Sequence, residues 1–513
     1  MMAADDARAR RWTLVAMILA SGIVFLDGSV VNVALPAIDR NLGAGLTGLQ
    51  WIVNGYTLTL AAFLILGGSL GDHYGRSWVM LLGLLGFGVA SVACGLAPQT
   101  GGLIAARLVQ GLAGALVVPG SLAILTAVYT DDEERGRAIG AWSGASGITT
   151  VLGPFLGGWL VDTLSWRWIF FINVPFIAVA VWLIWRHVPE TRDPHAPRRL
   201  DWPGALLTIA GLGGVAFGLT EGPSLGWRAP LVIGSIVGGV ASLILFVIVE
   251  ARSDAPMLPL RLFRSRVFAG TNLATLGIYA ALSGASFFLT IYLQNTLGYS
   301  ALAAGASFFP LSIIVFALSS RFGQLAGRYG PRGFMAGGAF LFAIALLLLL
   351  RVGPGINYWT TIFPAILVLG LGLAMIVAPL TTAVMGAVPS DNAGIASAIN
   401  NVASRVAGLL AIAALGAVVS VAFNATLADR TRDLPQNPAI VAQIDAARRD
   451  PSGARPAVDL DPAVAAAITD AATASFHRTM LANAILAALG GLAAALTVGQ
   501  GGTAASARQS PPS

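Results

Sequence analysis

Runs of about 20 apolar residues recur along the whole chain and constrain its fold more than any other feature. A helix of this length spans the hydrocarbon core of a bilayer. Only 11% of the 513 residues are charged and the mean hydropathy is +0.78, whereas about 25% charged residues is usual in soluble domains. We therefore predict an all-α integral membrane protein that lies in a lipid bilayer.

The apolar runs define fourteen predicted membrane spans. Span 204–221 is the weakest of them because it is short and rich in glycine. The spans cover residues 12–35, 50–70, 78–97, 102–126, 138–161, 169–187, 204–221, 230–250, 268–293, 301–320, 334–351, 360–380, 395–422 and 479–500.

The arginines, which make up all 30 basic residues, are distributed unevenly between the two sides of these spans. If the N-terminus is cytoplasmic, the inner segments hold 18 arginines and the short outer loops hold only Arg40, Arg167, Arg228 and Arg351. An excess of positive charge is typical of cytoplasmic loops. We therefore expect both termini to be cytoplasmic, in the inner membrane of a bacterium. Residues 423–478 then lie outside, as a partly helical or loose flap or a solvated spacer.

A short motif occurs twice, 255 residues apart. The stretch GGSLGDHYGRSW (67–78) and the stretch GQLAGRYGPR (323–332) share the pattern G-x-L-x-x-x-Y-G. Each stretch lies between two apolar runs, and Gly71 and Gly75 are expected to supply the positive φ of a tight reversal between helices. The first copy carries Asp72 where the second has Gly327. The repeat predicts two related halves of the chain.

If two six-helix halves were joined directly, their equivalent loops would lie nearer 200 residues apart. The observed offset of 255 residues is longer than this. The excess matches spans 204–221 and 230–250, which we interpret as two linker helices between the halves. Parallel repeats of this kind are one recurring transporter architecture. The predicted parts are a six-helix bundle (1–187), the linker (188–265), a second six-helix bundle that includes the outer segment (266–502) and a cytoplasmic tail (503–513).

Three charged side chains lie well inside the predicted spans: Asp27, Arg107 and Arg405. A charge at the centre of a membrane helix costs at least about 2.5–3.5 kcal/mol, so each needs an aqueous cavity or a partner. The neighbours of Asp27 on its own helix are apolar, and desolvation raises the pKa of a carboxyl group. Asp27 is therefore either a proton site that faces a central cavity or an acid permanently paired with an arginine.

Arg107 begins a polar stripe that continues with Gln110 and Gly111 at helical spacing. It either holds a buried network that responds to the proton or bonds backbone carbonyls as a structural residue. Arg405 shares a helical face with Asn401, and no acid occurs within the spans of its half, so structural packing is favoured there.

The fifth span contains Gly153-Pro154 followed by Gly157-Gly158. Proline bends a helix because it removes a backbone hydrogen bond, and small residues allow close contact beside the bend. An ordinary transmembrane kink is the alternative, because both residue types are common in membrane helices.

Several classes of function lack their signatures in this sequence. There is no P-loop, no pair of histidines, no Cys/His cluster and no G-x-S-x-G motif. We therefore expect no enzyme activity, no cofactor and no metal site, and transport would run on an ion gradient or on the substrate's own gradient. The arginines are scattered between spans, so nucleic-acid binding is not expected.

Together these motifs resemble the fourteen-span drug:proton antiporter family of the major facilitator superfamily. The loop signature of that family matches at Gly68, Gly71, Asp72, Gly75 and Arg76, although His73 and Ser77 replace its usual basic residues. Its other signatures match at Leu26, Asp27, Val31, Asn32 and Pro36, at Leu103, Arg107, Gln110 and Gly111, and at Gly140, Gly153, Pro154, Gly157 and Gly158. Thr149 stands where the last signature has a glycine, and WRWIFFINVP (166–175) resembles the family's stretch that leads into helix six.

The resemblance implies a rocker-switch exporter in which Asp27 exchanges protons with help from Arg107. It also implies that residues 68–76 latch the cytoplasmic side. In the family, the loop acid lies against the N-terminus of a helix in the other half, which here is the thirteenth span, beginning near residues 391–395. A carboxylate is stabilised at such a helix terminus.

The partners expected are protons and a small-molecule substrate that is apolar or monocationic, because few acids lie inside the spans. Aromatic and polar side chains among small residues suit such a cargo. Two alternatives remain open, a carrier for a metabolite or lipid and a non-transporting membrane sensor. The candidate cavity residues are Asn32, Tyr56, Gln110, Phe287, Tyr292 and Arg405, and lipid or helix packing is the alternative role for the aromatic ones.

Overall fold

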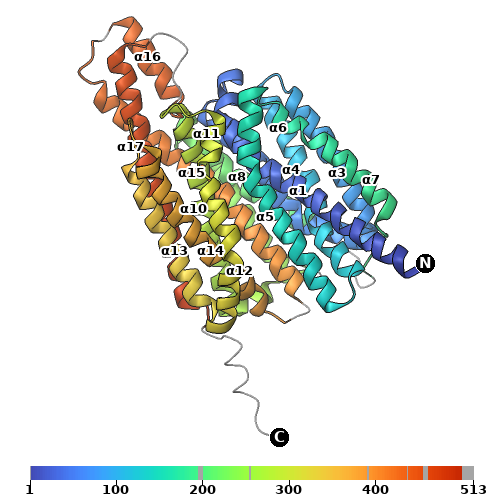
Figure 1. The fold of residues 1–513 in the computed structure, drawn as a ribbon. Helices are drawn as coiled ribbons and strands as arrows, with labels where there is room; N and C mark the ends of the chain where they lie inside the picture. The colour runs from blue at the N-terminus through green and yellow to red at the C-terminus, as the bar shows by residue number, and fades with distance from the viewer. Residues whose placement is uncertain are drawn as a thin grey trace. The chain divides into compact units, whose positions relative to one another are not determined.

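The computed structural model describes residues 2–193, 200–253, 256–389, 392–435, 437–453 and 460–499. Within these residues the regular structure is helical and no strand occurs (Figure 1). Fourteen helices in this part of the chain are long and apolar enough to cross a membrane, and each overlaps one predicted span. The fold class is confirmed. The predicted tail, residues 503–513, lies outside the described residues.

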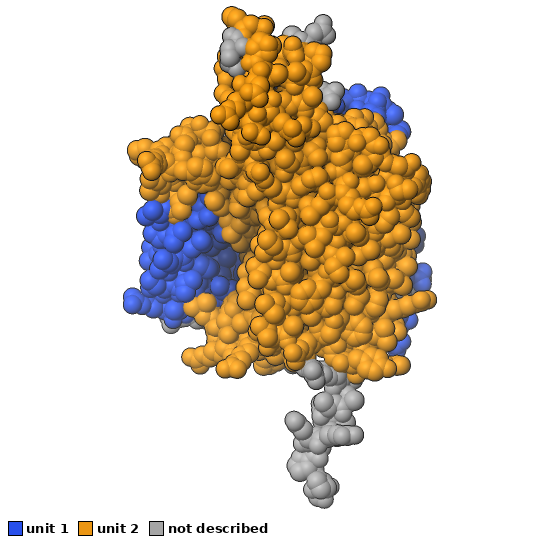
Figure 2. Space-filling model, turned by 90° about the vertical axis from the view of Figure 1, so that its left-hand side faces the viewer, with its two compact units in different colours: residues 1–44, 51–215, 237–258 blue, residues 45–50, 216–236, 259–513 orange. Residues whose placement is uncertain are grey.

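The chain forms two compact units, which Figure 2 shows in different colours. The first comprises residues 1–44, 51–215 and 237–258, and the second comprises residues 45–50, 216–236 and 259–513. The helices of the first unit are α1 (Met2–Leu42), most of α2 (Gly45–Tyr74), α3 (Arg76–Leu96), α4 (Thr100–Val128), α5 (Asp132–Thr163), α6 (Trp168–Phe171) and α7 (Asn173–His187).

The two helices predicted to form a linker are α8 (Trp202–Leu225) and α9 (Pro230–Arg252), and both are divided between the units. The glycines of α8 are packing positions, since a Cβ on Gly211 would lie 2.6 Å from Cδ2 of Leu243 on α9. The glycines that weakened the prediction of span 204–221 therefore allow close contact between helices. The helix α8 extends beyond that span at both ends.

The second unit contains the remaining helices and the first turn of α2. Predicted span 301–320 is interrupted at residues 307–308, and predicted span 360–380 begins in a short π-helix that continues directly into a long α-helix. The elements are η1 (Leu260–Arg264), α10 (Arg266–Asn295), α11 (Ala301–Ala306), α12 (Phe309–Tyr329), α13 (Pro331–Leu348), η2 (Leu349–Arg351), η3 (Tyr358–Ile362), α14 (Phe363–Gly386), α15 (Ala393–Arg430), α16 (Pro438–Arg449) and α17 (Pro462–Thr497).

In each copy of the repeated motif, a single glycine separates two helices. Gly75 separates α2 from α3 with φ 118°, and Gly330 separates α12 from α13 with φ 89°. These two glycines are 255 residues apart, as the sequence repeat predicts. The expectation of a short loop holding Asp72 and a positive φ at Gly71 is wrong. Both residues lie in the last turn of α2, because helical hydrogen bonding continues to Tyr74.

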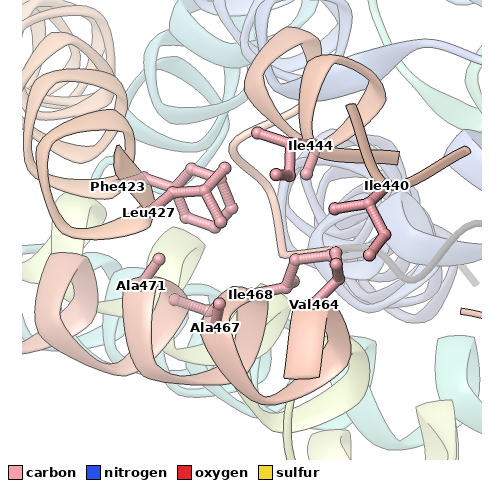
Figure 3. Close-up of a cluster of buried hydrophobic side chains, with 10 residues drawn as sticks. Phe423, Leu427, Ile440, Ile444, Val464, Ala467, Ile468 and Ala471 are labelled. Atoms are coloured by element: carbon pink, nitrogen blue, oxygen red, sulfur yellow. The ribbon is translucent and has the colours of Figure 1, made fainter. Parts of the chain in front are cut away.

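The described residues of segment 423–478 form a helical subdomain rather than a loose flap. The helix α15 continues to Arg430 and α17 begins at Pro462, so both extend past their predicted spans. Their ends enclose an apolar cluster together with α16 (Figure 3). This cluster consists of Phe423, Leu427, Ile440, Ile444, Ala447, Val464, Ala467, Ile468, Ala471 and Ala472. Buried apolar contact of this kind gives the segment a core of its own.

Candidate functional site

Asp27 is fully buried in the middle of α1, and its carboxylate binds side chains from two other helices. Oδ2 forms an ion pair with Nη1 of Arg107 on α4. Oδ1 accepts hydrogen bonds from Nε2 of Gln110 at 2.8 Å and from Nδ2 of Asn173 on α7 at 3.0 Å. The partner that the sequence left open is therefore Arg107, and three donors converge on one carboxylate. The proton-exchanging role of Asp27 remains a prediction.

Arg107 is almost fully buried and has partners on several sides. Its Nη1 also donates to Oε1 of Gln110 at 2.7 Å, and its Nε donates to the carbonyl oxygen of Ile52 at 3.1 Å. The guanidinium carbon lies 4.2 Å from the centroid of the Tyr56 ring, close enough for a cation–π interaction. A buried guanidinium thus has a counter-ion, two neutral acceptors and an aromatic face, which together offset its desolvation.

Ser91 and Asn173 complete this network, and the sequence reasoning missed both. The Ser91 hydroxyl accepts hydrogen bonds from Gln110 at 2.9 Å and from Asn173 at 3.3 Å. Both residues are fully buried. Asn173 is the single amide side chain in the apolar stretch that leads into α7. A lone amide among apolar residues is a sequence signal from which Asn173 could have been predicted. A serine inside a membrane helix is common, so Ser91 offered no such signal.

The residues predicted to form the gate lie in the end of α2 and at the start of α3, on either side of the break at Gly75. Nε of Arg76, the first residue of α3, donates to Oδ1 of Asp72, in the last turn of α2, at 2.8 Å across the break. Nη1 of Arg76 donates to the carbonyl oxygen of Ala123 near the end of α4 at 3.3 Å. The carbonyl oxygen of Asp72 accepts from the backbone amide of Asp193 at 3.2 Å. Asp72 and Arg76 thus pair with each other and join three segments of the first unit.

Glu190 is a third residue that the sequence reasoning missed. Its carboxylate accepts hydrogen bonds from the backbone amides of Ser77 and Trp78, both at 3.1 Å, in the first turn of α3. The N-cap residue of α3 is Gly75, which has no side chain and cannot cap the helix itself. Glu190 follows α7, so it caps a helix that begins 114 residues earlier in the chain, and nothing in the local sequence indicates this.

The glycines of α5 divide into close-contact and open positions. A Cβ on Gly153 would lie 1.9 Å from Oγ of Ser29, and a Cβ on Gly157 would lie 2.4 Å from Cγ2 of Val30, both on α1. Gly158 is also buried, whereas Gly140 is exposed with nothing within 4 Å of such a Cβ. The helix continues through Pro154 without a break. The glycines therefore bring α5 against the part of α1 that follows Asp27.

The predicted cavity residues are divided between the two units, with Asn32, Tyr56 and Gln110 in the first and Phe287, Tyr292 and Arg405 in the second. Tyr56 and Gln110 belong to the Asp27 network, and Asn32 is half-buried on α1. Phe287 packs edge-to-face against Phe288 at 4.9 Å, while Tyr292 stacks on Phe476 at 4.2 Å and bonds Thr473 at 2.9 Å. Arg405 is half-buried on α15. For Phe287 and Tyr292 the observed contacts are those of helix packing.

In the part of the chain that the structure describes, fourteen apolar helices with a charged network buried among the first six define an α-helical integral membrane protein of the transporter class. The chain belongs to the Major Facilitator Superfamily, whose family model matches residues 17–412. The resemblance inferred from the motifs is thereby confirmed, and the most informative relatives carry resistance and export names.

The puromycin resistance protein pur8 of Streptomyces alboniger is 37% identical over 423 residues, which cover 82% of this chain and 84% of that protein. The multidrug resistance protein Stp of Mycobacterium tuberculosis (strain CDC 1551 / Oshkosh) is 36% identical over 425 residues, covering 82% of this chain and 78% of Stp. The tetracenomycin C resistance and export protein of Streptomyces glaucescens is 34% identical over 421 residues, covering 81% of this chain and 77% of that protein.

Among solved structures, the fold is similar to that of a bacterial homologue of the human lysosomal transporter Spinster in an inward-facing, unoccupied conformation. The TM-score is 0.63 at 18% identity, covering 95% of this chain and 97% of that one. A D-xylose–proton symporter gives a TM-score of 0.60 at 13% identity, covering 95% of this chain and 98% of that one. At these identities the likeness establishes the fold alone.

Proposed function

We propose that this protein is a proton-coupled antiporter that exports drug-like or antibiotic small molecules across the cytoplasmic membrane of a bacterium. The names of the resistance and export relatives support the direction and the class of cargo. The arginine asymmetry supports cytoplasmic termini. The small number of acids inside the spans supports a cargo that is apolar or carries a single positive charge, and no enzyme activity is proposed.

The observation that carries the proposal is the buried pair of Asp27 and Arg107. Protonation of Asp27 would remove the charge that Arg107 balances and convert one carboxylate oxygen from acceptor to donor. Arg107 would keep Gln110, Ile52 and the Tyr56 ring as partners, so it would remain satisfied while α1 and α4 lose their ion pair. A proton at Asp27 would thereby change how tightly these two helices are joined, which is what a coupling site must do.

The energy available is sufficient for export. A membrane potential of about 100 mV supplies about 2.3 kcal/mol per charge, and one pH unit supplies about 1.4 kcal/mol. One proton exchanged for one neutral cargo molecule would then support a gradient of roughly 500-fold.

Residues 68–76 act in this proposal as the cytoplasmic gate, with Asp72 set against the N-terminus of α15 in one state of the cycle. In support, α15 begins at Ala393, within the predicted range, although Asp391 lies outside the described residues. The side chain of Asn392 does not cap α15, so its first amides are suited to an incoming carboxylate. We expect Asp72→Asn to slow export without unfolding the protein, and normal export at wild-type expression would contradict the gate.

The proposal is tested by transport in proteoliposomes with an imposed pH gradient, across a set of dyes and antibiotics. We expect gradient-driven efflux by the wild type and none by Asp27→Asn, with Asp162→Asn, an exposed acid on α5, as the matched control. If Asp27→Asn still pumps, Asp27 is not the coupling site. If the wild type moves no cargo under any gradient, the exporter proposal fails, and uptake of a metabolite or lipid would favour the carrier alternative.

A further inference from the structure

Glu250, at the end of α9, is a buried acid that the proposed transport cycle does not use. The sequence places it as the last residue of span 230–250, where a charged side chain would ordinarily reach water. In the structure α9 continues to Arg252, and the Glu250 side chain turns inward so that only 2% of the residue is exposed. Its carboxyl group meets that of Asp201, which directly precedes α8.

Each of these two carboxyl groups is half satisfied by a backbone amide. Oε2 of Glu250 accepts from the amide of Leu258 at 2.8 Å, and Oδ1 of Asp201 accepts from the amide of Gly204 at 2.9 Å. The other two oxygens, Oε1 of Glu250 and Oδ2 of Asp201, are buried and accept from no donor among the described residues. They lie 2.7 Å and 2.4 Å from the point that a Cβ on Gly204 would occupy.

Among the described residues, none with a positive charge pairs with either of these two oxygens. Within the described residues, neither acid forms an ion pair, and Asp201 is the titratable group that acts on Glu250. The other groups acting on Glu250 are the backbone amides of Leu258 and Met257. Arg252, on the same helix, is exposed. Two neighbouring carboxylates in a buried site cannot both remain ionised at low cost, and one shared proton relieves the repulsion.

We propose that Asp201 and Glu250 bind one proton between them, so that the linker helices carry a proton site separate from Asp27. The proton supplies the donor that both oxygens lack and joins the start of α8 to the end of α9. When it leaves, two negative charges face each other across Gly204 and the two helix ends move apart. This proposal does not depend on the transport direction or on the role of Asp27.

The expected separation can be measured with a pair of spin labels. Leu206 on α8 and Ile248 on α9 are 58% and 42% exposed and make no part of the carboxyl pair. The labels are introduced as Leu206→Cys and Ile248→Cys with Cys94→Ala, because Cys94 is the only native cysteine. We expect the distance between the labels to increase as the pH is raised from about 5 to about 9 in the full-length protein.

The Glu250→Gln substitution is the decisive variant, because its amide can donate to Oδ2 of Asp201 while its oxygen still accepts from Leu258. We expect this variant to keep the short distance at every pH. Glu221→Gln, an acid at the other end of α8, should leave the pH response as it is in the wild type. A label distance in the wild type that does not change with pH would overturn the proposal, as would an unchanged response in Glu250→Gln.

Infrared spectroscopy gives a readout that does not depend on the labels. We expect the difference spectrum, wild type minus the Asp201→Asn/Glu250→Gln double variant, to show a protonated carboxyl band that shifts in heavy water and disappears at high pH. A difference spectrum without this band would overturn the assignment. The measurements are repeated with sodium replaced by choline, and a response that follows sodium instead of pH would show a cation site and contradict the proton site.

Discussion

The contact between α5 and α1 can be tested by replacing glycine with alanine at two positions of α5, Gly157 and Gly140. Only the first lies against α1, so the difference in stability between the two variants reports the packing contact. Alanine at Gly157 would place a Cβ 2.4 Å from Cγ2 of Val30 and 3.0 Å from the carbonyl oxygen of the same residue. A methyl group can turn away, but the backbone oxygen cannot, so the two helices must separate. Alanine at Gly140 of the same helix meets nothing within 4 Å.

The expected magnitudes follow from these distances. Replacing glycine by alanine inside a helix stabilises it by about 0.5–1 kcal/mol at either position, because the unfolded chain loses conformational freedom. Overpacking a close contact costs about 1–3 kcal/mol. Gly140→Ala should therefore be neutral or slightly stabilising, and Gly157→Ala should be less stable than Gly140→Ala by about 1–3 kcal/mol.

The assay is the unfolding midpoint of both purified variants in the same detergent, with wild-type protein alongside. The helix-propensity gain is common to the two variants, so it cancels in the comparison. Equal midpoints for Gly157→Ala and Gly140→Ala would refute the reasoning, because they would mean that α5 does not rest on Val30 in the folded protein.

Three further substitutions test other contacts. Glu190→Ala removes the cap of α3 and should lower the unfolding free energy by about 0.5–2 kcal/mol, whereas Glu133→Ala, an exposed acid on α5, should change it little. Gln110→Leu removes hydrogen bonds to two charged groups and should cost about 3 kcal/mol, measured by the unfolding midpoint; a cost below about 1 kcal/mol would contradict the network. Ile444→Ala in the subdomain core should cost about 2–5 kcal/mol locally and speed proteolytic cleavage within residues 431–461, and unchanged cleavage would mean that the cluster does not stabilise this segment.

The sequence was sufficient for the features that depend on the bilayer. A charge in an apolar run is expensive enough to stand out, so Asp27 and Arg107 could be singled out before any contact was known. The repeat likewise predicted that Gly75 and Gly330 occupy equivalent places, because a one-residue reversal with positive φ favours glycine.

Features that depend on tertiary contact were not predictable in the same way. Glu190 lies after α7 among polar residues, and its role exists only because the chain returns to the start of α3. The segment 423–478 was expected to be partly helical or loose, and its apolar core was missed for a different reason, since its alanine, proline and charge content is typical of a loose segment. The pairs Ile440 and Ile444, and Val464 and Ile468, are spaced four residues apart and were the available signal of two amphipathic helices.

The continuity of α15 and α17 into the subdomain has a practical consequence for imaging. With 38 residues, α15 is about 57 Å long, whereas the hydrocarbon core of a bilayer is about 30 Å thick. The excess length carries α16 and its core as a projection of the second unit (Figures 1 and 2). An antibody fragment raised against this projection would provide an alignment marker for electron cryo-microscopy, where proteins confined to a detergent belt offer little contrast. Under the proposed orientation, the same fragment would bind intact cells from outside.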